Sequence, residues 1–238
     1  MPVLEVFGPP EQWPNEDLVA FSDQFDAGLV LAAYQSGVFP MPLHQAFFGR
    51  RMAWWSPVRR GVLEPGALRV SHSLRQSARR YRVTVNQAFP AVLAGCADPS
   101  RPNGWIDDDV RAIYTDLHRS GLVVSVEAWT MAGELAGGLY GVSLGGLFAG
   151  ESMFHRPDIG RDASKVALRH LVEEWLDPPG RRLVDVQWAT PHLASLGVVE
   201  IDRRDYLRRL AEVIDEPAPA WPAPRLEPAS RGASSPSG

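Results

Sequence analysis

Three short β-rich runs decide the fold: Leu122-Val-Val-Ser-Val-Glu-Ala-Trp129, Glu134-Leu-Ala-Gly-Gly-Leu-Tyr-Gly-Val142 and Leu147-Phe-Ala-Gly-Glu-Ser-Met-Phe154. Glycine-containing turns separate them, which is typical of antiparallel strands that follow one another in a meander. A different period follows, because the apolar residues of Ser164–Leu176 recur at helical spacing. Arg182–Trp188 then indicates one more apolar strand. Antiparallel strands, a helix and a further strand predict an α+β fold with a mostly antiparallel sheet.

The segments outside this region divide the chain into three expected parts. Residues 1–65 are rich in proline and aromatic residues and contain one clear helix near Ala27–Gln35. Residues 66–215 hold the meander and further predicted helices, at 71–81, 87–96, 109–119 and 205–213. Residues 216–238 contain six prolines with Ser, Gly and Ala, a composition that predicts a disordered tail. We therefore expect a small N-terminal domain, a larger domain and a Pro-rich tail.

The composition excludes several classes of protein. The 238 residues are 45% hydrophobic and include eight Trp and nine Phe, so disorder over the full length is excluded. Cys96 has no partner cysteine, so an internal disulfide framework is excluded. The apolar runs are too short to cross a bilayer, and the segment after Met1 lacks the pattern of a secretory signal. A cytoplasmic protein without a membrane partner is expected.

The formal net charge of −4 hides an uneven distribution. Residues 1–30 hold six acidic residues and no Lys or Arg, whereas residues 50–82 hold nine arginines against the single acid Glu64. Guanidinium groups suit phosphate groups well, so the second segment is a candidate for contacts with a nucleic-acid backbone. A solvated charged surface is the alternative interpretation.

Two polar residues stand inside an apolar strand, Asp185 and Gln187. Strand alternation predicts that both lie on one face, with Val184, Val186 and Trp188 on the other. Burying an acid and an amide is costly unless they are paired or used. We interpret them as a carboxylate that orients an amide holding a substrate. A hydrogen-bonded pair that steadies a loop is the alternative.

Two weaker signals lie nearby. Glu151 follows a strand run and Gly150, a residue that lets a ligand or another backbone approach closely. The helix near Ser164 offers free N–H groups and Lys165 as a seat for an anion, although capping by Asp162 or Ser164 explains that pattern more simply. No metal site is predicted, because the six histidines are scattered without ligand spacing.

Eight motifs follow one another in the order of a known family: Phe39-Pro40, Trp54-Trp55-Ser56-Pro57, Gly104-Trp105-Ile106, Gly137-Gly-Leu-Tyr-Gly-Val142, Gly150-Glu-Ser-Met-Phe154, Ala163-Ser164-Lys165, Val184-Asp-Val-Gln187 and Ser195-Leu196-Gly197. Over residues 27–210 the sequence resembles leucyl/phenylalanyl-tRNA–protein transferases. The resemblance implies a small N-terminal domain and a second domain of the GNAT-type acyltransferase fold. It implies transfer of leucine or phenylalanine from aminoacyl-tRNA to the N-terminal arginine or lysine of an acceptor protein, which marks that protein for degradation. It implies no metal or organic cofactor, and we expect a monomer.

The resemblance also implies roles for single residues. Gln187 is expected to hold the donor's α-amino or carbonyl group, Asp185 to orient that group or accept the nucleophile's proton, and Glu151 to bind the acceptor amine. Trp105 matches an aromatic residue that contacts the 3′-terminal adenosine. The expected tRNA-binding residues are Arg75, Arg79, Arg80 and Lys165. The positions that match the family's donor pocket are Leu139, Met153, Leu168, Leu171, Trp175 and Val184.

The sequence departs from the family at several positions. Met41-Pro42 stands where tryptophan usually follows Phe39-Pro40, so one stacking platform for the adenosine is lost. Ser22–Phe25 replaces a Gly-Gly-Asp-Leu run, and residues 157–161 include a short insertion. Leu171 and Trp175 stand where phenylalanine is familiar, which bears on the choice among Leu, Phe and Met.

Two other functions remain open at this stage. An acyl-CoA-dependent N-acyltransferase of the same fold needs a Gly-rich pyrophosphate loop, and the segment before Ser164 offers only Gly160. The other is a tRNA-binding module without catalysis. Its best argument is the departure from the family pattern at Met41.

Overall fold

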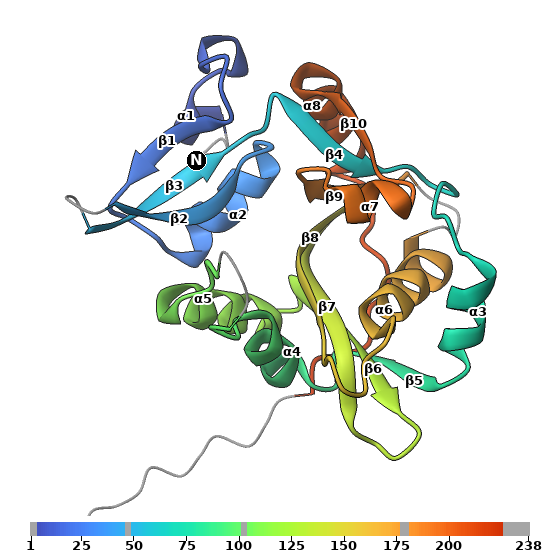
Figure 1. The fold of residues 1–238 in the computed structure, drawn as a ribbon. Coiled ribbons are helices and arrows are strands. Elements are labelled where there is room, and N and C mark those ends of the chain that lie inside the picture. Colours follow the sequence, from blue (N-terminus) through green and yellow to red (C-terminus); the bar gives the residue numbers. More distant parts are fainter. Residues whose placement is uncertain (1–3, 46–48, 101–103, 177–180, 226–238) are drawn as a thin grey trace, which may run out of the picture.

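The computed structural model describes residues 4–45, 49–100, 104–176 and 181–225. Within them the chain forms a small N-terminal domain, coloured blue to light blue in Figure 1, and a larger domain of mixed sheet and helices, coloured cyan to red. The larger sheet is mostly antiparallel, so the predicted α+β class is confirmed.

The N-terminal domain is built on a sheet that the sequence did not predict. Its described strands are antiparallel in the order β1-β3-β2, with bounds Leu18–Ser22, Gly49–Trp55 and Phe39–Gln45. The short helix α1 (Leu4–Phe7) and the 3₁₀ turn η1 (Pro10–Gln12) precede it. The predicted helix α2 (Ala27–Gln35) is confirmed: the Asp26 side chain accepts from the Leu29 amide at its start. Gly37, at φ 79°, follows its end and turns the chain into β2.

The larger sheet has the order β10-β4-β9-β8-β7-β6-β5 in the described part of the chain. Its bounds are Val199–Asp202 (β10), Arg59–Leu63 (β4), Leu183–Gln187 (β9), Leu147–His155 (β8), Leu135–Leu144 (β7), Val123–Thr130 (β6) and Tyr81–Val85 (β5). The meander predicted from the three β-rich runs is therefore β6-β7-β8. Among these neighbours, β8 and β9 form the parallel pair, whereas the other pairs are antiparallel.

Helices cover both faces of this sheet. They are α3 (His72–Ala78), α4 (Phe89–Cys96), α5 (Asp108–Arg119), α6 (Ala163–Leu171), α7 (Pro191–Ser195) and α8 (Arg203–Val213). The helix expected over 164–176 changes character near its end, because Val172–Leu176 (η2) forms a π-helical turn. The helix expected over 71–81 is shorter, and the Ser71 side chain caps its start by accepting from the Leu74 backbone amide.

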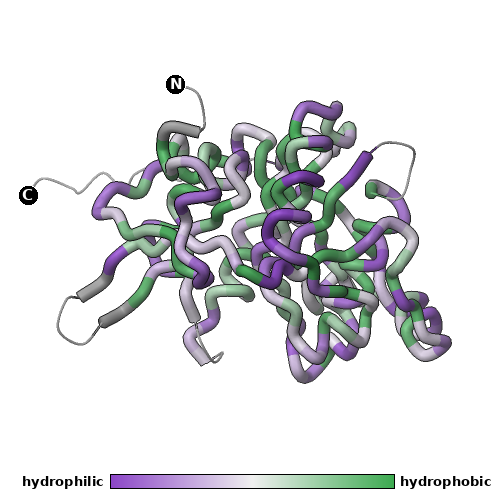
Figure 2. Tube along the Cα trace, turned by 90° about the horizontal axis from the view of Figure 1, so that it is seen from above, coloured by the Kyte–Doolittle hydropathy of each residue, from purple (hydrophilic) through white to green (hydrophobic). Residues whose placement is uncertain are grey.

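Alternating residues of the central strands separate two hydrophobic cores. Tyr140 and Val142 of β7 belong to a core shared with α4, α5 and the N-terminal domain, whereas Leu139 belongs to a core shared with α6. Figure 2 shows hydrophobic stretches running through the interior of the molecule. The first core therefore joins the two domains, and the second lies between the sheet and α6.

Two predictions about domain limits differ from the structure. β4 lies inside the segment assigned to the N-terminal domain, yet it pairs with β9 and β10 in the larger sheet. The disorder expected over 216–238 is wrong for residues 216–225, which pack on the larger domain; the Trp221 indole donates to Ser143 Oγ at 2.8 Å. Residues 226–238 lie outside the described residues.

None of the helices among the described residues is long and apolar enough to cross a membrane.

Candidate active site

The parallel strands β8 and β9 pair over a short length and then separate. Their register runs from Leu147 opposite Leu183 to Ala149 opposite Asp185. Beyond that point Glu151 on β8 and Gln187 on β9 face each other, and the Gln187 Nε2 donates to Glu151 Oε1 at 3.3 Å. We call this separation the strand opening. It brings together Glu151 and Gln187, two of the three residues for which the resemblance implies catalytic roles; the third, Asp185, stands two residues before Gln187 on β9.

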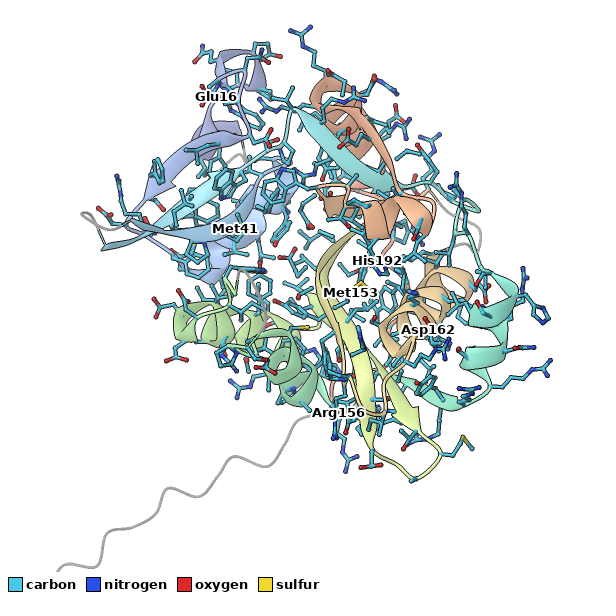
Figure 3. The ribbon with its side chains drawn as sticks, viewed as in Figure 1. Glu16, Met41, Met153, Arg156, Asp162 and His192 are labelled. Carbon is cyan, nitrogen blue, oxygen red and sulfur yellow. The ribbon has the colours of Figure 1, made fainter. Side chains whose placement is uncertain are left out.

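An apolar cavity of about 140 Å³ lies at the strand opening. For comparison, a cavity of about 150 Å³ lined by Leu, Ile and Phe binds benzene in another protein, so this volume suits one isobutyl or benzyl side chain. Five of the six residues expected in the donor pocket line it: Leu139, Met153, Leu168, Leu171 and Val184. Met153 lies between β8 and α6 (Figure 3). Glu151 and Gln187 contribute to the wall of the same cavity.

The prediction that Trp175 lines this cavity is wrong. Trp175 lies in the π-helical turn η2 and packs on Trp221, with ring centroids 5.0 Å apart and an interplanar angle of 31°. The wider turn changes the direction of side chains after Leu171, so spacing for a regular helix does not place Trp175 correctly.

Asp185 forms a fully buried ion pair with Arg60 of β4. Arg60 Nε donates to Asp185 Oδ1 at 2.8 Å and Nη2 to Oδ2 at 2.5 Å. Arg60 also donates to the Gly37 carbonyl and lies against the rings of Phe39 and Tyr206, whose hydroxyl donates to Asp185. Burial is the largest single influence on the pKa of Arg60 and lowers it. The charge and hydrogen bonds of Asp185, together with the nearby Tyr206 and Tyr34, more than offset this, so the pKa ends above its ordinary value. The pair is thus a fixed ionic unit that joins both domains.

Asp185 positions Gln187 through the backbone. Its Oδ1 accepts the Gln187 amide at 2.9 Å, and Gln187 has a φ of 59° in the left-handed region. A residue other than glycine adopts that conformation at a cost of about 1–3 kcal/mol, which the Asp185 contact helps to offset. The turn also ends strand alternation. Trp188 was expected on the same face as Val184 and Val186, but it packs with Phe39 in the other core.

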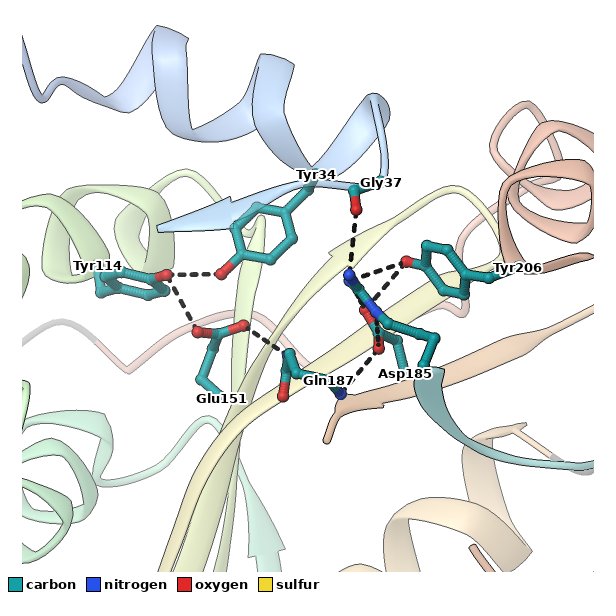
Figure 4. A network of polar contacts seen from close by, with 8 residues as sticks. Tyr34, Gly37, Tyr114, Glu151, Asp185, Gln187 and Tyr206 are labelled. Atoms are coloured by element: carbon teal, nitrogen blue, oxygen red, sulfur yellow. Dashed lines mark hydrogen bonds and ion pairs between the residues drawn. The ribbon is translucent and has the colours of Figure 1, made fainter. Parts of the chain in front are cut away.

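Glu151 has a different environment. Its Oε2 accepts the Tyr114 hydroxyl at 3.1 Å, and the hydroxyls of Tyr114 and Tyr34 lie 2.6 Å apart (Figure 4). Burial raises the pKa of Glu151 to about 8, although hydrogen bonds from Tyr34 and Tyr114 act in the opposite direction. No salt bridge among the described residues involves Glu151. This carboxyl can therefore gain or lose a proton near neutral pH.

Comparison with known proteins matches this chain to one family. The family model described as leucyl/phenylalanyl-tRNA protein transferase matches residues 62–211, and that of its N-terminal domain matches residues 23–58. The leucyl/phenylalanyl-tRNA–protein transferase of Ruegeria sp. (strain TM1040) is 47% identical over 206 residues, which cover 84% of this chain and 94% of that protein. The protein of the same name from Edwardsiella ictaluri is 43% identical over 210 residues, which cover 86% of this chain and 82% of that protein. The chain belongs to the leucyl/phenylalanyl-tRNA–protein transferase family. It is an aminoacyltransferase.

Two solved structures have a weaker likeness. L-PGS from Bacillus licheniformis matches with a TM-score of 0.36 and 10% identity, covering 78% of this chain and 62% of that one. A GCN5-related N-acetyltransferase-like protein from Streptococcus suis matches with a TM-score of 0.35 and 15% identity, covering 74% of this chain and 64% of that one. These scores are too low to carry an argument.

Several residues of this transferase site were missed by sequence analysis. Arg60, Tyr34, Tyr114 and Tyr206 come from β4, α2, α5 and α8, so no local motif joins them. Arg60 had one usable signal, because it precedes the apolar run Gly61–Leu63 of a strand. An arginine buried in a strand needs an acidic partner, and Asp185 was the acid already identified in another strand.

Two positions that the resemblance links to the tRNA terminus, Trp105 and the departure at Met41, lie toward α5 and in the N-terminal domain. Trp105 is half-buried, with its ring edge-on to Tyr114 at 6.3 Å. Met41 stands on β2, where its carbonyl accepts the Trp55 indole at 3.1 Å (Figure 3). Trp105 therefore neighbours the tyrosine that binds Glu151.

The arginine-rich segment does not form one surface. Arg75, Arg79 and Arg80 are exposed on and just after α3, but Arg60 is buried against Asp185. Lys165 binds Asp162, with Nζ 3.0 Å from Oδ1. Asp162 precedes α6 but does not cap it through its side chain, because that carboxylate accepts from Ser77 and Lys165 instead. The three exposed arginines are the stronger candidates for tRNA contacts.

The described residues contain no group of three or more His, Cys, Asp or Glu side chains that could hold a metal ion.

Proposed function

We propose that this enzyme transfers leucine or phenylalanine from its tRNA to the N-terminal arginine or lysine of an acceptor protein. One observation carries the proposal: an apolar cavity of about 140 Å³ has Glu151 and Gln187 in its wall. The cavity would hold the donor side chain, and the two polar groups would act on the ester and the attacking amine. The unbranched side chain of methionine fits the same volume, so methionyl-tRNA is included as a donor.

The chemistry needs positioning and proton transfer. The acceptor's α-amine attacks the ester carbonyl carbon, the new C–N bond forms and the ester C–O bond breaks. The amine's proton passes to the Glu151 carboxylate and then to the departing ribose oxygen of the tRNA. Gln187 holds the donor group, and Asp185, neutralised by Arg60, keeps Gln187 in place. Alignment of two bound reactants supplies much of the rate increase in such transfers.

The acceptor and the outcome are also part of the proposal. An N-terminal Arg or Lys has a cationic side chain and an α-ammonium group, and both suit carboxylates. The product would carry leucine or phenylalanine at its N-terminus and enter a degradation pathway in the cytoplasm. We assign tRNA backbone contacts to Arg75, Arg79 and Arg80, and contact with the terminal adenosine to Trp105.

The test is a transfer assay with leucyl-, phenylalanyl- and methionyl-tRNA run side by side. Labelled amino acid should pass to a peptide that begins with Arg or Lys. An acetyl-Arg peptide is the matched control and should receive none, since its amine is blocked. Absence of transfer from all three tRNAs would refute the proposal. Binding of tRNA without transfer would favour the non-catalytic module, and saturable binding of acetyl-CoA would favour the acyl-CoA enzyme.

A further inference from the structure

The chain after α8 forms a packed segment, residues 216–225, which we call the C-terminal strap. It starts where α8 ends at the β7–β8 turn; the Gly146 amide donates to the Val213 carbonyl at 2.8 Å. A Cβ on Gly145 would lie 1.9 Å from the Ile214 carbonyl oxygen, so only glycine allows this approach. At its other end the strap is held by Asn86, whose Nδ2 donates to the Pro222 carbonyl at 2.7 Å.

Trp221 fixes the middle of the strap. Its indole N–H donates to Ser143 Oγ at 2.8 Å. Its ring packs against Trp175, with centroids 5.0 Å apart, and against Phe148, with centroids 6.1 Å apart. The strap thus places one large aromatic side chain over the core between the sheet and α6.

Phe148 connects the strap to the cavity at the strand opening. Phe148 lines that cavity, and Trp221 does not. Trp221 therefore forms a second layer behind the wall, and Trp175 belongs to the same layer. The strap also lies beyond residues 62–211, which the family model matches. A residue outside the shared domain therefore supports one wall of its cavity.

We propose that Trp221 determines how large a donor side chain this enzyme accepts, by holding Phe148 in place. The inference rests on the proposed function, since it concerns the donor's leucyl or phenylalanyl group. Protein interiors are close-packed, so a wall residue with no support behind it can move into the space left. Without Trp221, Phe148 can retreat and the cavity can lengthen. The larger donor then gains relative to the smaller one.

The test compares Trp221→Ala with the wild type in competition between phenylalanyl- and leucyl-tRNA. We expect the ratio of kcat/KM for phenylalanine to that for leucine to rise about tenfold, the effect of roughly one methylene in an apolar pocket. Trp13→Ala is the matched control, because Trp13 is a partly buried tryptophan far from the cavity, hydrogen-bonded to the Phe7 carbonyl. Truncation after Arg225 is a second control, and both should keep the wild-type ratio.

Two further measurements keep the inference testable if the variant is unstable or if no transfer occurs. Trp221→Phe keeps an aromatic ring behind Phe148 and should show a smaller shift in the same direction. Calorimetric affinities for phenylalanine methyl ester and leucine methyl ester report the cavity without any transfer step. An unchanged ratio in both Trp221→Ala assays would overturn the inference. Absence of transfer by the wild type would instead refute the proposed function, and the ester affinities would still test the strap.

Discussion

Two carboxylates lie at the same strand opening in opposite environments. Asp185 is fully buried, binds Arg60 through both oxygens and accepts the Tyr206 hydroxyl. Glu151 is partly buried, has tyrosine and amide partners, and has its pKa raised to about 8. Asp185 is thus paired with a cation, whereas Glu151 has neutral hydrogen-bond partners in a desolvated place, which allows its carboxyl to change charge. In the proposed mechanism the first therefore positions Gln187, and the second exchanges the proton.

The largest expected effect is that of Glu151→Gln. The amide is close in shape but cannot accept the amine's proton, so kcat should fall by about 10²–10⁴-fold. Single-turnover transfer with saturating aminoacyl-tRNA measures it. Glu127→Gln is the matched control, because Glu127 is a fully buried carboxylate of β6 bound by Ser125 and Thr84. If Glu151→Gln keeps its rate within tenfold of the wild type, Glu151 does not carry the proton.

Arg60→Met should act mainly on stability. It leaves the Asp185 charge buried without its cation, a loss worth about 3–5 kcal/mol in comparable pairs. The free energy of unfolding from a urea titration measures the change. The double variant Arg60→Met with Asp185→Leu removes both charges and should recover most of the loss. If the single variant is as stable as the wild type, the ion pair does not hold the domains and the Gln187 turn together.

Features that depend on neighbouring residues in the sequence were predictable, and features that depend on residues far apart in the sequence were not. The meander β6-β7-β8 was predictable, because glycine turns and β-branched residues act over a few neighbours. The partners of the two carboxylates were not. Arg60 and Asp185 are 125 residues apart, and Tyr114 and Glu151 are 37 apart, so no local pattern links them.

The composition of the C-terminal strap predicts a different state from the one in the structure. Its prolines predicted disorder, yet one tryptophan and one asparagine anchor residues 216–225. Trp175 was misplaced because a π-helical turn cannot be read from apolar spacing. The left-handed turn at Gln187 gave no signal either, since a residue other than glycine occupies it.

Stability should depend on pH through Glu151. Its pKa is raised from 4.5 to about 8 in the folded state, so the folded state binds more protons than the unfolded state between these values. The free energy of unfolding therefore falls as pH rises from about 4.5 to 8. Burial also raises the pKa of Glu127, so part of the fall comes from that residue. Urea titrations at several pH values should show a shallower fall for Glu151→Gln; an unchanged slope would contradict the raised pKa.

Tyr114→Phe should have a moderate effect on the same carboxylate. It removes a hydroxyl that donates to Glu151 and favours its charged form. The pKa of Glu151 should rise, and the pH–rate profile for transfer should shift to higher pH by up to about one pH unit, equivalent to about 1.4 kcal/mol. Tyr206→Phe, which affects Asp185 instead, should leave that profile in place. Equal shifts in both variants would remove the distinction between the two carboxylates.

The smallest expected effect at saturating tRNA is that of Arg75→Ala with Arg79→Ala. These exposed residues lie away from both carboxylates, Arg75 on α3 and Arg79 just after it. The slope of log affinity against log salt should become flatter by about two, since each phosphate contact contributes about 0.9 on a duplex. The transfer rate at saturation should stay the same. An unchanged slope would assign the two arginines to the solvated surface.

The proton-transfer role of Glu151 is tested most directly by titrating its carboxyl. Protein with ¹³C-labelled glutamate side chains can be followed by NMR across the pH range in which it remains folded. We predict one carboxyl signal with a pKa of about 8 that is absent from Glu151→Gln and present in Glu127→Gln. If the signal assigned to Glu151 instead titrates near the ordinary value of 4.5, the contrast between the two carboxylates is wrong.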